Sequence, residues 1–142
     1  MNKMLLRTSF ALIAFAATSC LAESDIPNLV GKWTGEKEFA KILKTEGPVG
    51  RSHTPHEEFG KINVDVEFTM QKGRLLKGTK TSEKWSERLV CVIDYDNKGL
   101  YCTDENGMFD GQLVGKDEIV FHYHHVTSDN SIVSVMKLAK RE

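Results

Sequence analysis

The segment from Ile62 to Met70 restricts the fold of this chain more than any other. Apolar and polar side chains alternate along it without a break, as Ile62, Val64, Val66, Phe68 and Met70 against Asn63, Asp65, Glu67 and Thr69. Successive side chains of a β-strand point to opposite faces, so a period of two predicts a strand with one buried and one solvated face. We expect the apolar set to face the interior and the polar set to face solvent.

Seven further segments have the composition of short strands, and turn signals separate them. The segments are 29–38, 75–82, 88–95, 100–103, 108–114, 119–126 and 132–139. The turn signals include Lys72-Gly73, Asp96-Asn97-Lys98-Gly99 and Glu105-Asn106-Gly107, which are rich in residues that favour tight turns. None of the three prolines falls inside a predicted strand.

Eight strands joined mostly by hairpins can form a closed barrel or a two-sheet sandwich. Closure removes the unpaired edges that a small open sheet would expose to aggregation. We therefore predict an all-β fold, a single eight-stranded antiparallel up-and-down β-barrel. The interior of such a barrel is either filled by side chains or holds one small ligand.

The first residues have the pattern of a secretory signal peptide. Lys3 and Arg7 are followed by the apolar stretch 9–17 and then by small residues. Cleavage before Glu23 predicts a signal peptide at 1–22 and a barrel domain at 23–142, released into the periplasm or secreted. In the alternative, residues 17–20 resemble a lipoprotein box, and Cys20 is lipidated and anchors the protein to the outer membrane.

The charge of the mature chain excludes one class of partner. Removal of Lys3 and Arg7 leaves 17 basic and 20 acidic residues, a formal net charge of −3. No basic cluster remains that could follow a phosphate backbone, so nucleic acid is not an expected partner. A membrane is expected as a partner only if Cys20 is lipidated.

The start of the first predicted strand carries a family resemblance. Gly31-Lys32-Trp33-Thr34 resembles the G-x-W opening of the calycin superfamily, which includes lipocalins and avidins, and the whole region is similar to uncharacterised bacterial secreted calycin-like proteins. The resemblance implies that Gly31 and Trp33 mark the fold, that Trp33 packs across the closed end, and that Lys140 or Arg141 stacks on it. Biotin binding is not implied, because Gly35 stands where avidin has Asn and only Trp85 remains as a second tryptophan.

No catalytic group, metal site or cofactor is expected. His122 and His124 share one face of a strand and His125 the other, while His53 and His56 lie in a long connection. A His-x-His pair can serve a zinc or copper site. The spacing matches no closed structural metal motif, so we interpret these histidines as polar rim or outward residues.

The long connection at 40–59 is the predicted entrance to a binding site. We expect the barrel to bind a small, mainly apolar ligand lined by Val64, Val66, Phe68 and Met70, with Phe59 among the residues that cap it. Further capping residues are Ile42, Leu43 and Val49, and Lys41, Lys44 and Arg51 would meet an acidic head group. The alternative is a solid-cored barrel that binds an envelope protein as an accessory factor or inhibitor.

Cys91 and Cys102 are predicted to form a disulfide. With Asp96 and Asn97 at the tip of their hairpin, the residue count places Cys91 directly opposite Cys102. Directly opposed strand residues have Cα separations near the range that a disulfide requires. An even pair of cysteines in an exported protein is typical of a structural bridge.

Thiol titration tests this bridge in mature protein purified from the periplasm. Denatured but unreduced protein is expected to show no free cysteine, and reduction is expected to release both thiols. Two reactive thiols before reduction would remove the structural role and favour a redox or metal site instead.

Overall fold

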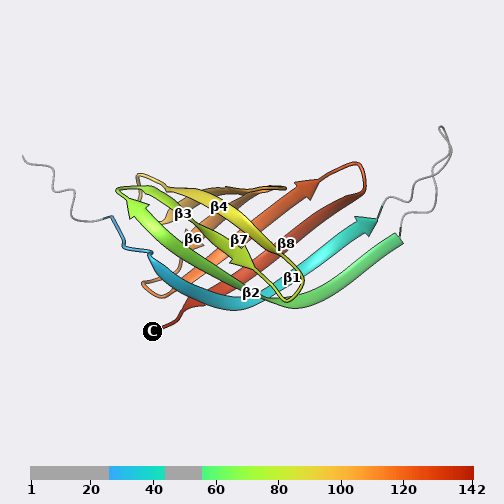
Figure 1. Ribbon diagram of the computed structural model, residues 1–142, viewed down its shortest axis with the longest axis horizontal. Coiled ribbons are helices and arrows are strands. Elements are labelled where there is room, and N and C mark those ends of the chain that lie inside the picture. The colour runs from blue at the N-terminus through green and yellow to red at the C-terminus, as the bar shows by residue number, and fades with distance from the viewer. Residues whose placement is uncertain (1–25, 44–55) are drawn as a thin grey trace, which may run out of the picture.

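The computed structural model describes residues 26–43 and 56–142, which form eight antiparallel strands (Figure 1). The strands are β1 (Gly31–Leu43), β2 (His56–Lys72), β3 (Leu75–Thr81), β4 (Ser86–Ile93), β5 (Gly99–Asp104), β6 (Met108–Leu113), β7 (Glu118–Val126) and β8 (Asn130–Lys140). The predicted signal peptide at 1–22 with Cys20 lies outside the described residues, as do Lys44, Val49, Arg51 and His53.

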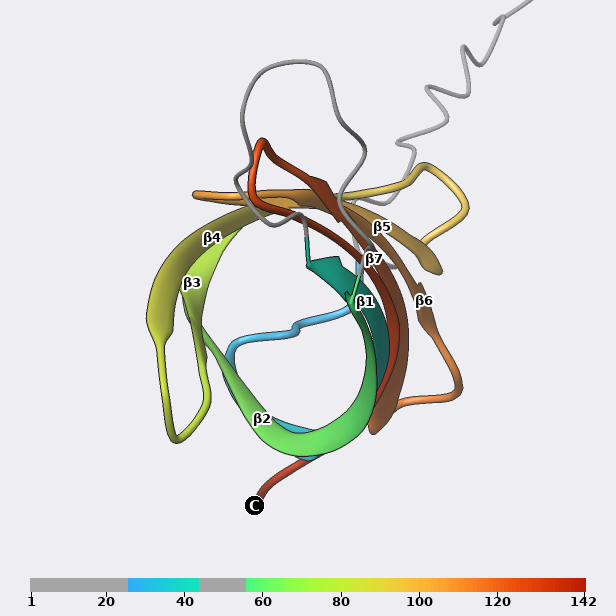
Figure 2. The same ribbon diagram turned by 90° about the vertical axis from the view of Figure 1, so that its right-hand side faces the viewer.

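Each strand pairs with its neighbours in sequence, and β1 also pairs with β8, which closes the barrel. Figure 2 looks along the barrel and shows the strands forming a ring. The predicted eight-stranded up-and-down β-barrel is confirmed. No helix within residues 26–43 and 56–142 is long and apolar enough to cross a membrane.

The interior of the barrel is packed with apolar side chains. Trp33, Phe68, Phe109, Phe121, Ile93, Leu100, Ile119, Met136 and Leu138 are all almost completely buried and belong to one continuous cluster. They come from strands around the whole ring, and along each strand they alternate with exposed residues. In an eight-stranded barrel the interior is just wide enough for side chains to fill it, and here they do.

The closed end is built around Trp33. Its indole Nε1 donates a hydrogen bond of 2.9 Å to the carbonyl of Leu29, whose side chain is buried in the core. Gln71 holds this incoming segment, because its amide oxygen accepts from the Leu29 N–H at 2.9 Å. The ammonium of Lys140 lies 5.4 Å from the centre of the Trp33 ring. This stacking is the geometry that the resemblance implied.

The disulfide prediction is confirmed. Cys91 and Cys102 are directly opposed on β4 and β5 and are bonded through their sulfurs. Both side chains are buried in the core. The hairpin turns at Asn97, which has a positive φ of 62°, a conformation that asparagine tolerates better than most residues.

The predicted inward orientation is correct for Val64, Val66 and Phe68 and wrong for Met70. The pairing of β2 with β3 slips between Phe68 and Met70, which indicates a β-bulge. A bulge adds one residue to one strand and reverses the faces of those that follow. Met70 is consequently 52% exposed on the outside, and Gln71 turns towards the closed end.

The predicted long connection at 40–59 is shorter than expected, because its two ends are strand. Residues Ala40 to Leu43 continue β1 and pair with residues His56 to Phe59 of β2. Strand alternation then places Phe59 on the outer face, where it is 76% exposed. It does not lie over the barrel interior as a cap.

Alanine substitutions on either side of the bulge test this register. Phe68→Ala is expected to lower the free energy of unfolding by about 3–5 kcal/mol, because it leaves a cavity in a packed core. Met70→Ala is expected to change it by about 0.5 kcal/mol or less, since the side chain is on the surface. Urea unfolding of both variants measures the difference, and equal losses would contradict the bulge.

Candidate functional site

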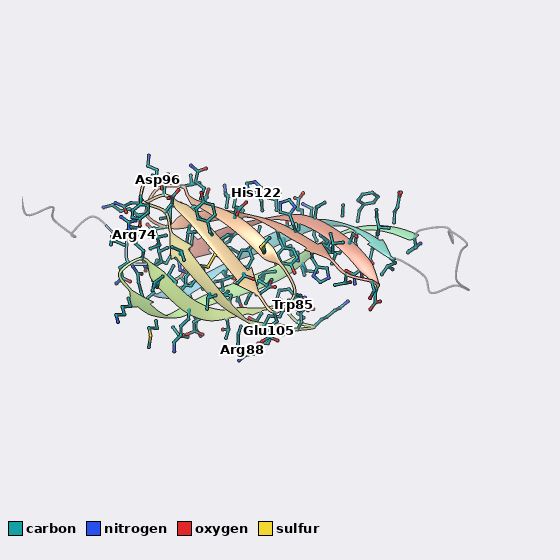
Figure 3. The ribbon with its side chains drawn as sticks, turned by 90° about the horizontal axis from the view of Figure 1, so that it is seen from above. Arg74, Trp85, Arg88, Asp96, Glu105 and His122 are labelled. Carbon is teal, nitrogen blue, oxygen red and sulfur yellow. A yellow bond between two sulfur atoms is a disulfide. The ribbon has the colours of Figure 1, made fainter. Side chains whose placement is uncertain are left out.

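Four strands extend beyond the rest at one end of the barrel, here called the mouth end. β2 pairs with β3 only from Asp65 onwards, whereas it pairs with β1 back to His56. Figure 1 shows β1, β2, β7 and β8 projecting together at this end. In Figure 3, Arg74 and Asp96 lie at the closed end, and Trp85, Arg88 and Glu105 lie further towards the projecting strands.

A group of charged and aromatic side chains, here called the mouth cluster, lies where the apolar core ends. Its members are Lys37, Lys80, Trp85, Glu87, Asp104 and Tyr123. They come from five strands, β1, β3, β4, β5 and β7, and from the β3–β4 turn that holds Trp85. Closure of the barrel is what brings them together.

Lys80 is fully compensated within this cluster. It is 1% exposed, and its ammonium bonds to the carboxylate of Asp104 and lies 3.1 Å from that of Glu87. The same ammonium lies 4.4 Å from the centre of the Tyr123 ring. The other oxygen of Asp104 accepts hydrogen bonds from the backbone of Asn106 and Gly107. A buried ion pair with this many partners is satisfied on both sides.

Lys37 is nearly as buried, but none of the described carboxylates lies within ion-pair distance of it. It is 6% exposed, and among the described residues it makes no ion pair or hydrogen bond. Its ammonium faces two aromatic rings, with centres at 4.6 Å in Tyr123 and 5.7 Å in Trp85. Burial, followed by repulsion from Lys80, lowers the pKa of Lys37 to about 8, and attraction to the carboxylates of Glu87 and Asp104 offsets this only in part. The site therefore contains a desolvated cation that an incoming anion would stabilise.

Two further polar groups lie on the inner face beside this lysine. The hydroxyl of Ser134 is buried and has no hydrogen-bond partner among residues 26–43 and 56–142, and it lies directly across the ladder from Tyr123. The Tyr123 hydroxyl lies 3.2 Å from Nδ1 of His125, and burial raises the pKa of Tyr123 above its usual range. Buried polar atoms without partners are uncommon in folded proteins, so the Ser134 hydroxyl requires a physical explanation.

A cavity of about 270 Å³ opens beside the mouth cluster, between β2 and the β3–β4 turn. Its lining includes Ile62, which is paired with Lys37, and Trp85, which lies over the Lys37 ammonium. The rest of the lining is polar, namely Glu36, Lys61, Asn63, Ser82, Glu83 and Lys84. Lys37 thus lies behind the wall of a small accessible cavity.

The structure separates the residues that the sequence assigned to one ligand site. Val64, Val66 and Phe68 belong to the packed core, while Met70 and Phe59 lie on the outside. Sequence reasoning missed Lys37 and Lys80, although a signal was present. Lys37 continues the inward phase of Trp33 and Gly35, and Lys80 continues that of Leu76 and Gly78. A lysine at an inward position marks a buried charge.

The histidines do not converge. His122 and His124 are exposed on the outer face of β7, His125 points inwards and His56 begins β2. Within residues 26–43 and 56–142, no three His, Cys, Asp or Glu side chains are grouped closely enough to hold a metal ion.

Comparison with known proteins gives only distant likeness in fold. No protein-family model matches the chain, and no curated protein matches it. Among solved structures, a redesigned β-barrel is similar over 87% of this chain and 98% of its own, with 12% sequence identity and a TM-score of 0.45.

The two buried lysines are expected to respond in opposite ways to replacement by methionine. Lys37→Met is expected to raise the free energy of unfolding at pH 7 by about 1–2 kcal/mol, because it removes a desolvated charge. Lys80→Met is expected to lower it by about 3 kcal/mol, since Asp104 is then buried without its partner. Urea unfolding at pH 7 measures both changes.

The pH dependence provides the control. Folding lowers the pKa of Lys37 from 10.5 to about 8, so the folded state binds fewer protons than the unfolded state between these values. The cost of the charged lysine is complete below pH 8 and is relieved as the pH rises towards 10.5. The advantage of Lys37→Met should shrink over that window, and a constant advantage would contradict the assignment.

Proposed function

We propose that this protein is an exported small β-barrel that binds a small molecule with an apolar body and an anionic group at its mouth end. Export is supported by the charge, apolar and small-residue order of 1–22 and by the Cys91–Cys102 disulfide. Membership of the calycin superfamily is part of the proposal, supported by the G-x-W opening and by the stacking of Lys140 on Trp33.

The buried ammonium of Lys37, which forms no ion pair among the described residues, is the observation that carries the proposal. An anion that reached it would gain a charge-assisted hydrogen bond in a poorly solvated place, where such bonds are strong. The Ser134 hydroxyl offers a second donor nearby on the inner face. The aromatic rings of Trp85 and Tyr123 suit the apolar part of the same molecule.

The proposed site lies above the core and not within it. Val64, Val66 and Phe68 are packed against other core side chains, so an apolar ligand would have to displace them. The 270 Å³ cavity at Ile62 and Trp85 offers an entrance, and movement of the Trp85 ring would connect it to Lys37. A cavity of this size suits a small ligand and not a long acyl chain.

Binding of an anionic apolar probe tests the proposal. The sulfonate dye 1-anilinonaphthalene-8-sulfonate is expected to bind the full mature chain and to change tryptophan emission through Trp85, since Trp33 is sealed in the core. Lys37→Gln is expected to weaken binding by roughly tenfold or more, because it removes a charge-assisted hydrogen bond. Lys137→Gln is the matched control, an outward-facing lysine on the neighbouring strand β8 that already has Glu118 as a partner.

The pH profile and a neutral dye complete this test. The probe keeps its charge at all pH values used, so its affinity should fall as the pH rises through about 8 and Lys37 loses its proton. The uncharged dye Nile red should show no such fall. Equal binding by wild type and Lys37→Gln, or no binding of the anionic dye, would contradict the proposal.

A second candidate is the solid-cored barrel that binds another protein. The packed core favours it, because a filled interior leaves the surface as the place for recognition. The outer face also carries exposed apolar side chains, among them Val126, Val133 and Phe59. Failure of the dye experiments would make this candidate the leading one.

A further inference from the structure

Within the described residues, β2 has a long strand edge without a partner at the mouth end of the barrel. β2 pairs with β1 from His56 to Phe68, but its other side pairs with β3 only from Asp65 onwards. Among the described residues, 56–64 therefore have a strand neighbour on one side only. Unpaired backbone groups along such an edge are a template for pairing with a further strand.

The residues of this edge also carry the most exposed aromatic ring of the projecting strands. Phe59 lies at the end of a cross-strand row on the outer face, formed in order by Met108, His124, Val133, Ala40 and Phe59. Hollows of about 650 and 340 Å³ lie along this row, and Phe59, Ala40 and Val133 contribute to both. A strand added beside β2 would cover Phe59 and extend the row.

The charge pattern of the β2 edge indicates that the added strand is the same segment of a second copy of this chain. Residues 57–61 read Glu57-Glu58-Phe59-Gly60-Lys61. If two copies of this segment pair antiparallel about Phe59, each Glu57 lies opposite the partner's Lys61, and the two Phe59 rings meet at the centre. Opposed residues of an antiparallel pair share a face, so both contacts form on the outer side.

The neighbouring registers lack this match. Pairing centred on Gly60 sets each Lys61 against Phe59 and each Glu57 against Asn63. Pairing centred on Lys61 sets the two lysines against each other, which is unfavourable. A register shifted by a single residue would place an inward-facing residue of one copy opposite an outward-facing residue of the other. The register centred on Phe59 is the one that satisfies both charge and face.

We propose that two copies of this protein associate edge to edge through residues 57–61 of β2, in the antiparallel register centred on Phe59. The contact is isologous, with each copy presenting the same strand, as a twofold axis requires. It joins β7, β8, β1 and β2 of one copy to β2, β1, β8 and β7 of the other in one continuous sheet. Ligand binding at the mouth end is not needed for this association.

Lys61 is able to serve both copies. Its ammonium lies 2.6 Å from a Glu38 oxygen and 3.1 Å from a Glu36 oxygen within its own chain, and more than half of its side chain is exposed. An ammonium has three protons, so Lys61 can donate a hydrogen bond to a third carboxylate. The paired sheet would then carry Glu38, Lys61 and the Glu57 of the other copy in one row of alternating charge.

A charge-swap series tests the proposal on the full mature chain. Sedimentation velocity over a concentration series is expected to show a monomer–dimer equilibrium for the wild type. Glu57→Lys and Lys61→Glu are each expected to raise the dimer dissociation constant by roughly tenfold, because each sets like charges opposite one another twice. The double variant Glu57→Lys/Lys61→Glu is expected to restore the dimer.

The double variant separates association from loss of fold. Lys61→Glu also breaks the bonds to Glu36 and Glu38, which the second substitution cannot repair, so recovery reports the contact between copies. Lys77→Glu, an exposed lysine on β3, is the matched control and should not change the dissociation constant. A wild type that stays monomeric at all concentrations, or a dimer that ignores the single reversals, would overturn the proposal.

Discussion

The hydrogen bonding of β1 to both β2 and β8 is the constraint on which the rest of the structure depends. It turns a meander of hairpins into a ring, and every strand then has one face inside and one outside. A ring of eight strands encloses a space only as wide as the side chains that fill it. The large rings of Trp33, Phe68, Phe109 and Phe121 occupy that space, so binding has to take place at an end or on the surface.

The two ends of the barrel differ in the side chains that complete the core. At the closed end, the segment before β1 packs Leu29 against Trp33, and Gln71 and Lys140 bond to its backbone. At the mouth end, charged side chains follow the apolar core, and Lys80 forms ion pairs with Glu87 and Asp104. Lys37 shares the same low-dielectric surroundings without a carboxylate of its own. The desolvation of Lys37 costs stability, and it is the observation behind the binding role proposed for this end.

Among the described residues, the closed barrel also has an unpaired edge of β2 at its surface. The strands differ in length, so the ring is complete only where all eight are present. Between Asp65 and the mouth end, β2 does not pair with β3, and its unpaired edge carries Phe59. The same four projecting strands thus border the proposed ligand site on their inner face and form the proposed contact between copies at their edge.

Local sequence was sufficient wherever one hairpin or one strand decides the outcome. The alternation from Ile62 to Phe68 determined a strand and its inward face, and the residue count between Cys91 and Cys102 determined their register and their bond. Met70 and Phe59 required the tertiary structure, because a bulge and the true length of β1 and β2 set their faces. The pairing of Lys80 with Asp104 depends on how the consecutive strands β3, β4 and β5 curve, which no single hairpin reveals. Lys37 of β1 meets Tyr123 of β7 only because the barrel closes through β1 and β8, and no local pattern encodes that contact.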